Sequence, residues 1–534
     1  MPAEAESPVN IDNLEAMLQS HPDTRAVDFI IQGLRDGFSL GCTCEIQPAQ
    51  PNNLRSATDN AEAVTQAFNK ELENNHICGP YSHPPMTNLH CSPVGSRPKK
   101  DGTVRLILDL SQPEGNSVNA GIDKEDYSVH FETFDCATDI VKKLGQGTFL
   151  AKIDIKSAFR LLPVRPSEWF MLGMHWMGAY FVDCHLPFGC RSSPFIFSVF
   201  SDLVAWLLEQ EAGIPNITHY LDDYLLACNS DESTASRELD AALRMFGHLR
   251  IPIAYDKLVR PTTKLTYLGI DIDTSGMLIS LPADKLHELK QALPMWLNRK
   301  KCTKRELLSL IGKLAFATKV VRPGRTFLRR LIDLSMSAKK LHHHIDLNTE
   351  ARKDIRWWIE FLPNWNGRNI IIDTQPSTST IFELYTDASD IGFGIYFDGH
   401  WVSEKWPEFI GNDICTYNID FRELFAIYAA IIIFAGKLSG RQVIIHTDNL
   451  PIVHAWHKGS STSHLIMSLT RSILMIAANN EFAISLQHIP GVRNEAADAL
   501  SRLKLDAFQR LMPSSDPQGT VVPSAVWEWA SCPY

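Results

Sequence analysis

The feature that most constrains this chain is an apolar run interrupted by two adjacent aspartates. Residues 217–226 read I-T-H-Y-L-D-D-Y-L-L, with Asp222 and Asp223 in the middle. Because Asp favours turns, the run predicts a β-hairpin with both carboxylates at its tip. Adjacent like charges repel, so the pair favours a bound cation. A plain solvated turn is the alternative that this segment alone leaves open.

A second candidate strand carries another acid. Residues 149–155 alternate apolar with polar side chains, which is the period of a β-strand, and Asp154 stands on the polar side. Hard divalent ions take oxygen ligands, and two such ions can activate an attacking oxygen and stabilise a leaving one. Asp154, Asp222 and Asp223 are therefore candidate metal ligands.

The length of 534 residues is too great for one hydrophobic core, so we expect several domains. The pattern assigns no chemistry to residues 1–75, and it predicts strands with a few helices over 76–280. It then predicts helices over 281–372, where Thr303 to Glu306 (T-K-R-E) has the form of a capping box. After a polar stretch at 373–380, a second α/β pattern covers 381–505, and a tail covers 506–534.

The net charge of −10 does not by itself indicate a nucleic-acid-binding protein. Between Arg299 and Arg330, however, Glu306 is the only acid among many cations, which favours a contact with a phosphate backbone. A solvated helix face is the alternative. The eleven cysteines, without a secretion signal, predict reduced thiols in a cytoplasmic or nuclear protein that is not secreted. The longest apolar run, 424–436, is short of the ~20 residues that span a bilayer, so we expect no transmembrane segment and no membrane partner.

A second set of acids lies in the C-terminal half. Asp387 and Asp448 each end an apolar strand pattern, and Glu423 opens an apolar helix. Asp498 follows His488 by ten residues. Taken singly, each of these acids is more typical of a helix cap or a turn than of a metal ligand.

Six motifs, in order, resemble those of reverse transcriptases. Tyr220 to Asp223 resembles the Y-x-D-D box, and Asp154 to Phe159 (D-I-K-S-A-F) resembles the first aspartate motif. The remaining motifs are P-K-K-D-G with the strand after it, L-P-F-G-C-R-S-S-P, a lysine, and L-T-Y-L-G, at 98–109, 186–194, 257 and 265–269. The resemblance implies a right-hand polymerase of fingers, palm and thumb, an α/β (α+β) fold, over about 170 residues.

The resemblance also implies roles for individual residues. Asp154, Asp222 and Asp223 would be the catalytic metal ligands. Nucleotide-binding residues would be Lys100, Arg105, Phe159, Gly189 and Lys257. Primer or template would contact Tyr220, Leu268, Gly269, Arg322 and Arg325.

Several of these roles carry their own alternatives. The ring of Phe159 would exclude a 2′-hydroxyl by steric overlap. Lys99 rivals Lys100 for the triphosphate, and Lys257 could equally be a solvated surface lysine. Phe188 stands where retroviral enzymes usually carry Gln, so the contact with the sugar must differ there.

Together, Asp387, Glu423, Asp448 and Asp498 resemble the four-carboxylate set of ribonuclease H, and the fold implied for 381–505 is ribonuclease H-like. The resemblance implies two Mg²⁺ ions at each active site, with Mn²⁺ as an alternative. His488 would shuttle a proton or help to release product.

The whole pattern resembles the reverse transcriptase and ribonuclease H segment of a retrotransposon, DIRS-type first and gypsy-type second. Expected partners are an RNA template, a DNA or RNA primer, an RNA–DNA hybrid and dNTPs. We find no recombinase or integrase pattern, so other proteins would supply integration. The rival function is a captured, non-catalytic nucleic-acid-binding protein. Loss of a metal carboxylate would favour that rival, but all seven are present.

Overall fold

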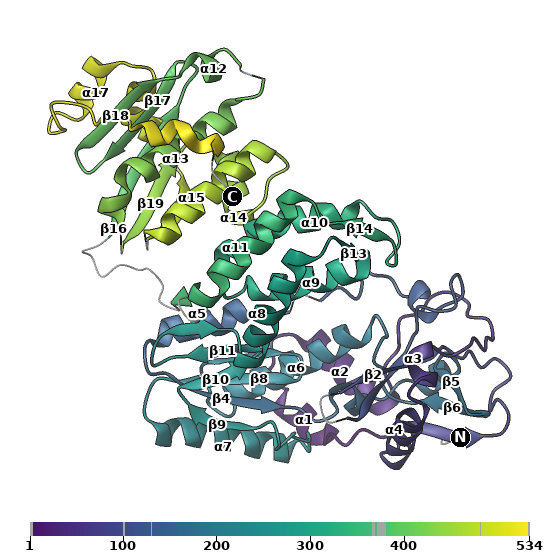
Figure 1. Cartoon of the computed structure of the whole chain (residues 1–534). Coiled ribbons are helices and arrows are strands. Elements are labelled where there is room, and N and C mark those ends of the chain that lie inside the picture. The colour runs from purple at the N-terminus through teal and green to yellow at the C-terminus, as the bar shows by residue number, and fades with distance from the viewer. Residues whose placement is uncertain are drawn as a thin grey trace. The chain divides into compact units, whose positions relative to one another are not determined.

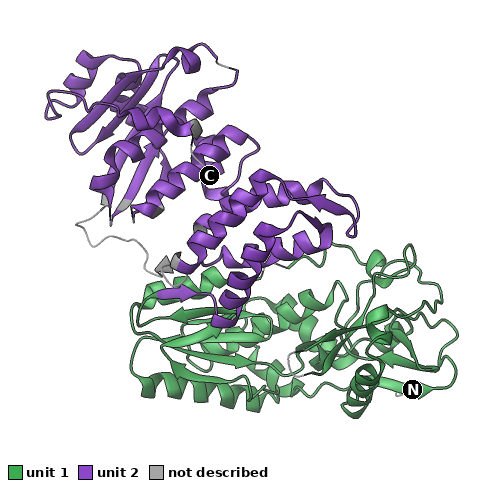
Figure 2. Ribbon diagram, in the orientation of Figure 1, with its two compact units in different colours: residues 1–277 green, residues 278–534 purple. Residues whose placement is uncertain are grey.

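The computed structural model describes residues 4–99, 102–129, 131–365, 369–370, 381–413, 415–439, 441–480 and 482–531. The chain divides into two compact units, residues 1–277 and 278–534 (Figures 1 and 2). Both units combine helices with strands, which confirms the predicted α/β class. The finer division into five regions stays a prediction.

The N-terminal helices belong to the core of the first unit. They are α1 (Ile11–Met17), α2 (Thr24–Asp36), α3 (Arg55–Thr58) and α4 (Ala61–Glu73). Leu14, Ile30 and Phe68 are buried in the same hydrophobic cluster as Phe197. The described part of residues 1–75, to which the sequence assigned no chemistry, therefore supplies packing surface for this unit.

The sheet that carries the first acids has the strand order β7-β8-β4-β9. Its strands are β4 (Phe149–Asp154), β7 (Ile217–Tyr220), β8 (Asp223–Cys228) and β9 (Val259–Thr262). A three-stranded sheet, in the order β1-β6-β5, comprises β1 (Ile77–Tyr81), β6 (Ala179–Asp183) and β5 (Gly173–Trp176). Two antiparallel pairs are β2 (Val94–Pro98) with β3 (Val104–Leu108), and β10 (Lys264–Tyr267) with β11 (Ile270–Asp273).

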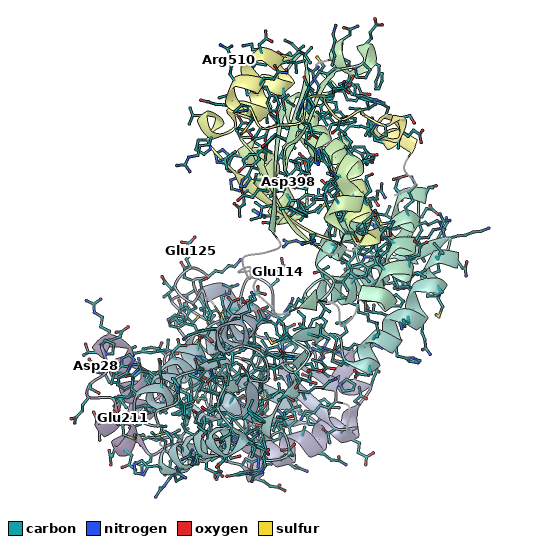
Figure 3. All side chains as sticks on the ribbon, turned by 90° about the vertical axis from the view of Figure 1, so that its left-hand side faces the viewer. Asp28, Glu114, Glu125, Glu211, Asp398 and Arg510 are labelled. Atoms are coloured by element: carbon teal, nitrogen blue, oxygen red, sulfur yellow. The ribbon has the colours of Figure 1, made fainter. Side chains whose placement is uncertain are left out.

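Helices accompany these sheets in the first unit. They are α5 (Phe134–Leu144), α6 (Ser193–Gln210) and α7 (Glu232–His248), with short 3₁₀ turns η1 (Val118–Gly121), η2 (Ala158–Leu161) and η3 (Pro166–Met171). The most apolar of the three α-helices is α6, and it buries Phe197, Phe200 and Leu207. Exposed acids such as Asp28 and Glu211 lie on the outside of the unit, where part of the surplus negative charge is solvated (Figure 3).

The second unit opens with the predicted helical region. Its helices are α8 (Ala283–Asn298), α9 (Lys304–Ala317), η4 (Arg322–Leu328), α10 (Arg329–Met336) and α11 (Thr349–Trp365). Short strands are β12 (Leu278–Ser280), β13 (Lys301–Thr303), β14 (His344–Asp346) and β15 (Asn369–Ile370). The predicted capping box is confirmed. The Thr303 hydroxyl accepts a hydrogen bond from the Glu306 amide at 3.3 Å, and the Glu306 carboxylate accepts one from the Thr303 amide at 2.8 Å.

A five-stranded sheet of order β18-β17-β16-β19-β20 follows in the same unit. Its strands are β16 (Ile381–Ala388), β17 (Gly392–Phe397), β18 (His400–Lys405), β19 (Gln442–Thr447) and β20 (Ala483–His488). Because β16, β19 and β20 run parallel, their carboxyl ends meet at one edge of the sheet. Asp387, Asp448 and His488 come to that edge.

The helices of this last region are α12 (Glu408–Gly411), α13 (Ile419–Leu438), α14 (Leu450–Lys458), α15 (His464–Asn479), α16 (Glu495–Ser501) and α17 (Leu505–Leu511), with η5 (Gly491–Arg493) and η6 (Ser524–Ser531). Helix α13 is apolar on nearly every side and packs on β16 and α15. Its position brings Glu423, near its first turn, to the sheet edge that carries Asp387.

Candidate active sites

The first site lies where β4 meets the β7–β8 hairpin. Strands β7 and β8 pair antiparallel, with Tyr220 opposite Asp223, so the predicted hairpin with aspartates at its tip is confirmed. The turn places Leu221 at φ +54°, a conformation that side chains rarely adopt. Asp154 pairs in register with Asp223, and the Ile155 amide donates to the Asp222 carbonyl at 2.9 Å. All three acids therefore gather at one end of the sheet.

Two lysines compensate the charge of these acids. Lys257 Nζ lies 2.8 and 3.0 Å from the two oxygens of Asp154, and Lys152 Nζ lies 2.9 Å from Asp223 Oδ1. Burial raises the pKa of Asp222, and the neighbouring carboxylates of Asp154 and Asp223 raise it further. Burial also raises the pKa of Asp223, while Lys152 opposes that shift. The site thus combines desolvated carboxylates with ammonium groups at contact distance.

Among the predicted nucleotide-binding residues, Phe159 follows β4 in the chain and Gly189 belongs to the L-P-F-G turn. Phe159, in η2, is 8% exposed, and its ring centroid lies 5.0 Å from that of Phe188 and 5.5 Å from that of Phe197. Gly189 has φ +107°, and a Cβ there would lie 2.5 Å from the Leu108 carbonyl oxygen. Only glycine fits that close approach.

The fingers ribbon carries the predicted phosphate contacts. Arg105 is exposed on β3, and its guanidinium carbon lies 5.2 Å from the centroid of the Phe188 ring. Lys99 is exposed, whereas Lys100 lies outside the described residues. The choice between the two lysines therefore stays open.

Sequence reasoning missed three residues in this unit. Asn119 bridges the L-P-F-G turn, because its amide donates to the Gly189 carbonyl at 2.9 Å and accepts from the Arg191 amide at 2.8 Å. Arg97 stands directly opposite Arg105 in the β2–β3 pair. Lys152, on the same strand face as Asp154, contacts Asp223. The K-D-G sequence at 100–102 is typical of a turn between two strands, so it could have revealed that Arg97 pairs with Arg105. No local signal marks Asn119.

The predicted primer and template contacts are spread over both units. Tyr220 is half-buried, with its ring 4.9 Å from that of Phe131. Leu268 and Gly269 form the two-residue loop between β10 and β11, both with positive φ. Next to that loop, the Tyr267 hydroxyl donates to the Asp223 carbonyl at 3.3 Å.

Arg322 and Arg325 both belong to η4 in the second unit. The Arg325 side chain is exposed and passes Gly459, where an added Cβ would lie 3.5 Å from it. The side chain of Arg322 is outside the described part of the structure.

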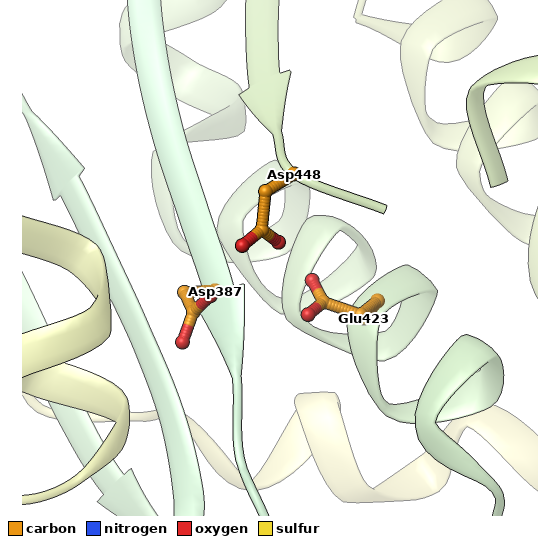
Figure 4. Close-up of side chains that lie close together, drawn as sticks. All are labelled: Asp387, Glu423 and Asp448. Atoms are coloured by element: carbon orange, nitrogen blue, oxygen red, sulfur yellow. The ribbon is translucent and has the colours of Figure 1, made fainter. Parts of the chain in front are cut away.

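The second site is a compact group of carboxylates. Asp387, Glu423 and Asp448 bring ligand oxygens within 4.8 Å of one another, and Figure 4 shows them converging from β16, α13 and the end of β19. Among the residues that the structure describes, no other group of three His, Cys, Asp or Glu side chains meets that distance. Glu423 is 3% exposed and Asp387 is 4% exposed.

Burial and mutual repulsion dominate the electrostatics of this group. Burial raises the pKa of Glu423 well above its ordinary value, and Asp387 and Asp448 raise it further. Burial raises the pKa of Asp387 to about 6, against a hydrogen bond from the Ser501 hydroxyl at 2.5 Å. In the described residues, none of the three carboxylates has a Lys or Arg nitrogen at ion-pair distance.

The two remaining predicted residues lie beside this group. Asp498, on α16, accepts from Arg502 Nε at 2.6 Å, and its oxygens are not part of the three-carboxylate set. Asp498 is still close enough to raise the pKa of Asp387. His488 is exposed at the end of β20, in register with Thr447, which precedes Asp448.

Residues 97–272 match the family model described as "Reverse transcriptase (RNA-dependent DNA polymerase)". That part of the chain is a reverse transcriptase domain, and it contains Asp154, Asp222 and Asp223. The Tf2-3 and Tf2-4 transposon polyproteins of Schizosaccharomyces pombe are each 22% identical to the chain over 433 residues, which is 78% of this chain. The chain is thus similar, at modest identity, to retrotransposon polyproteins, and it spans 29% of their length.

Solved structures of foamy viral protease–reverse transcriptase are also similar. One, in complex with double-stranded DNA, has 16% identity and a TM-score of 0.49, covering 92% of this chain and 84% of that one. Another, in complex with an RNA/DNA hybrid, has 16% identity and a TM-score of 0.49, covering 91% and 64%. Within the described residues, no helix is both long and apolar enough to cross a membrane.

Proposed function

We propose that the chain is an RNA-directed DNA polymerase joined to an endonuclease of the ribonuclease H type. The polymerase would be the nucleotidyltransferase that copies retrotransposon RNA, and the nuclease would degrade the RNA of the resulting RNA–DNA hybrid. The observation that carries the proposal is the match of 97–272 to the reverse transcriptase family model, with Asp154, Asp222 and Asp223 gathered inside it.

At the polymerase site, Asp154 and Asp222 would hold Mg²⁺, or alternatively Mn²⁺, with Asp223 beside them. Carboxylate oxygens suit these hard cations. Burial and then the neighbouring carboxylates raise the pKa of Asp222, and a bound cation would oppose both by stabilising the charged form. Two ions at such a site activate the attacking oxygen and stabilise the leaving one. Lys257 would exchange its contact with Asp154 for the leaving pyrophosphate, and Phe159 would exclude a ribose.

At the nuclease site, Asp387, Glu423 and Asp448 would hold the two ions, with Asp498 completing the set. The residues fit a cation because the buried carboxylates of Asp387 and Glu423 converge with the more exposed carboxylate of Asp448. In the described structure, none of the three has a Lys or Arg nitrogen at ion-pair distance. His488, exposed at the same sheet edge, would move a proton to or from the RNA strand.

The proposed partners are an RNA template, a DNA or RNA primer, dNTPs and an RNA–DNA hybrid. Support comes from the basic helical segment at 299–330 and from the relatives named above. Within the retrotransposons, the sequence favours a DIRS-type element, with gypsy-type as the second choice. Integration would then need a recombinase or integrase from another protein, and action would be in the cytoplasm or nucleus.

The test is primer extension on an RNA template with the unaltered chain and with Asp222→Asn. We expect labelled DNA product only from the unaltered chain. A labelled RNA strand in an RNA–DNA hybrid, with Asp387→Asn as the control, tests the nuclease. Binding of hybrid without synthesis or cleavage by the unaltered chain would contradict the proposal and favour the captured binding protein.

A further inference from the structure

The ring of Phe188 contacts both sides of the proposed nucleotide site. The Arg105 guanidinium carbon lies 5.2 Å from its centroid, within the range of a cation–π contact. The Phe159 ring lies 5.0 Å away at an interplanar angle of 45°, as aromatic pairs prefer when they are not face to face. One side chain therefore touches both the proposed phosphate-binding group and the proposed wall against ribose.

The backbone that follows Phe188 is held by close contacts. Gly189 approaches the Leu108 carbonyl so closely that no side chain fits there. Asn119 ties the Gly189 carbonyl to the Arg191 amide. A turn clamped in this way gives the Phe188 ring little freedom to leave Arg105.

Arg105 needs such a partner because of its neighbour across the ribbon. Arg97 and Arg105 are directly opposite in the β2–β3 register, and like charges at such positions repel. Repulsion alone would drive the Arg105 guanidinium away from Arg97. The contact with Phe188 gives it a defined resting place, with both cations still on the same face for an anion.

We propose that Phe188 is a positioning residue for the incoming nucleotide. It holds Arg105 ready for the triphosphate and braces Phe159 against the sugar, so that phosphate binding and sugar choice depend on one ring. This role rests on the proposed polymerase function. It also accounts for an aromatic side chain at a position where the resembling retroviral enzymes carry a polar one.

The first experiment compares Phe188→Leu, which removes the ring, with Phe188→Trp, which keeps an aromatic face. Phe195→Leu is the matched control, because Phe195 is also partly buried but packs on Tyr127 and Phe29 instead. From the strength of an exposed cation–π contact, we expect Phe188→Leu to raise the KM for dCTP about two- to fivefold, with kcat little changed. Phe188→Trp and Phe195→Leu should stay near the unaltered chain.

Two further readouts separate the phosphate from the sugar. Inorganic tripolyphosphate, used as a competitor of dCTP, should inhibit the Phe188→Leu variant about two- to fivefold more weakly, because it probes the phosphate contacts, Arg105 among them, without the sugar. The ratio of kcat/KM for dCTP to that for CTP should fall in the same variant, because Phe159 loses its brace. Melting temperatures check folding, and Phe188→Met replaces Phe188→Leu if the latter is unfolded.

A double-mutant cycle decides whether Phe188 acts through Arg105. In an Arg105→Gln background, Phe188→Leu should no longer change inhibition by tripolyphosphate. Equal effects in both backgrounds, or equal KM values for Phe188→Leu and Phe195→Leu, would overturn this inference. Absence of DNA synthesis by the unaltered chain would instead contradict the proposed function, so the two failures are distinguishable.

Discussion

The two carboxylate clusters meet the same electrostatic problem in different ways. In the first unit, Lys257 contacts Asp154 and Lys152 contacts Asp223, so each of these acids has a cation from its own chain. In the second unit, Asp387, Glu423 and Asp448 converge within 4.8 Å. Two of them accept hydrogen bonds from neutral hydroxyls, since Ser501 donates to Asp387 at 2.5 Å and Thr447 donates to Glu423 at 3.4 Å.

This difference sets how strongly each cluster depends on a bound cation. The second cluster holds its charge at a cost, because burial and repulsion raise the pKa values of both Glu423 and Asp387. In the first cluster, Lys152 and Lys257 oppose the effect of burial on Asp223. We infer that the first site tolerates the metal-free state, whereas the second favours either protons or metal.

The largest expected effect is loss of one proposed activity without the other. Asp154→Asn or Asp222→Asn should reduce DNA synthesis by about three orders of magnitude or more, equivalent to ~4 kcal/mol of barrier, because each acid would serve the same metal pair. Cleavage of RNA in a hybrid should continue. Primer extension and hybrid cleavage on the same preparation give both numbers. Synthesis close to that of the unaltered chain would contradict the assignment.

The reciprocal substitutions test the second cluster. Asp387→Asn or Asp448→Asn should stop cleavage of RNA in an RNA–DNA hybrid by a similar factor while DNA synthesis continues. The reason is that these acids belong to a different unit from Asp154 and Asp222. Loss of both activities in a folded protein would show that the clusters do not work independently.

The next effect concerns sugar choice beside the first cluster. Phe159 is 8% exposed between Phe188 and Phe197, so a 2′-hydroxyl pressed against it would find no free space. Phe159→Val should raise CTP incorporation relative to dCTP by orders of magnitude, at about 1.4 kcal/mol for each tenfold.

Single-nucleotide extension with dCTP and CTP on one template gives the two kcat/KM values. If Phe159 only packs the core, the variant will lose stability and both substrates together. An unchanged ratio in a well-folded variant would remove the steric role.

A smaller effect is expected on stability in the absence of metal. The folded state raises the pKa of Asp387 from 3.8 to about 6, so it binds this proton more tightly than the unfolded chain does. Protonated Asp387 therefore stabilises the fold below pH ~4, and that contribution, at most ~3 kcal/mol, is lost as the pH rises through about 6. Glu423 acts in the same direction.

Asp387→Asn should accordingly raise the melting temperature of the chelator-treated protein at pH 7.5, with less gain at pH 4.5. Mg²⁺ should stabilise the unaltered chain more at pH 7.5 than at pH 4.5, since protons compete with it. If the two proteins differ in melting temperature by the same amount at pH 4.5 and at pH 7.5, Asp387 is not the titrating group.

The local sequence pattern was enough to predict several features of both units. The hairpin with Asp222 and Asp223 at its tip and the capping box at Thr303 follow from neighbouring residues, and both are present. The sequence could not supply contacts that depend on packing between distant segments. Asn119 holds Gly189 from 70 residues away.

Strand register decides the ion pairs in a similar way. The alternation of side chains along β4 puts Lys152 and Asp154 on the same face of the strand. The register of β4 with β8 then brings Asp223 beside them, and Lys152 forms its ion pair with Asp223. Arg502, one helical turn from Asp498, donates to it at 2.6 Å, and Asp498 is the one predicted carboxylate that lies outside the tight group of three in the described structure. A list of acids cannot reveal which of them a basic side chain already occupies.

The smallest expected effect comes from removing a basic partner from the first cluster, which makes its charge balance resemble that of the second. Lys152→Met removes the ammonium group that lowers the pKa of Asp223, so this acid should titrate at higher pH in the folded state. Loss of stability relative to the unaltered chain should then be near zero in acid, where Asp223 is protonated. It should grow to about 1 kcal/mol as the pH rises through the new folded pKa, because the pair is mostly but not fully buried.

Urea unfolding of the chelator-treated protein from pH 4.5 to 7.5 measures this growth. Lys142→Met is the matched control, since Lys142 pairs at 3.0 Å with the exposed Asp139, where little stability is at stake. Adding Asp223→Asn to Lys152→Met should abolish the pH dependence. A loss that is equal at every pH would mean that Lys152 stabilises the sheet through its aliphatic stem, and the contrast between the two clusters would then not depend on this charge.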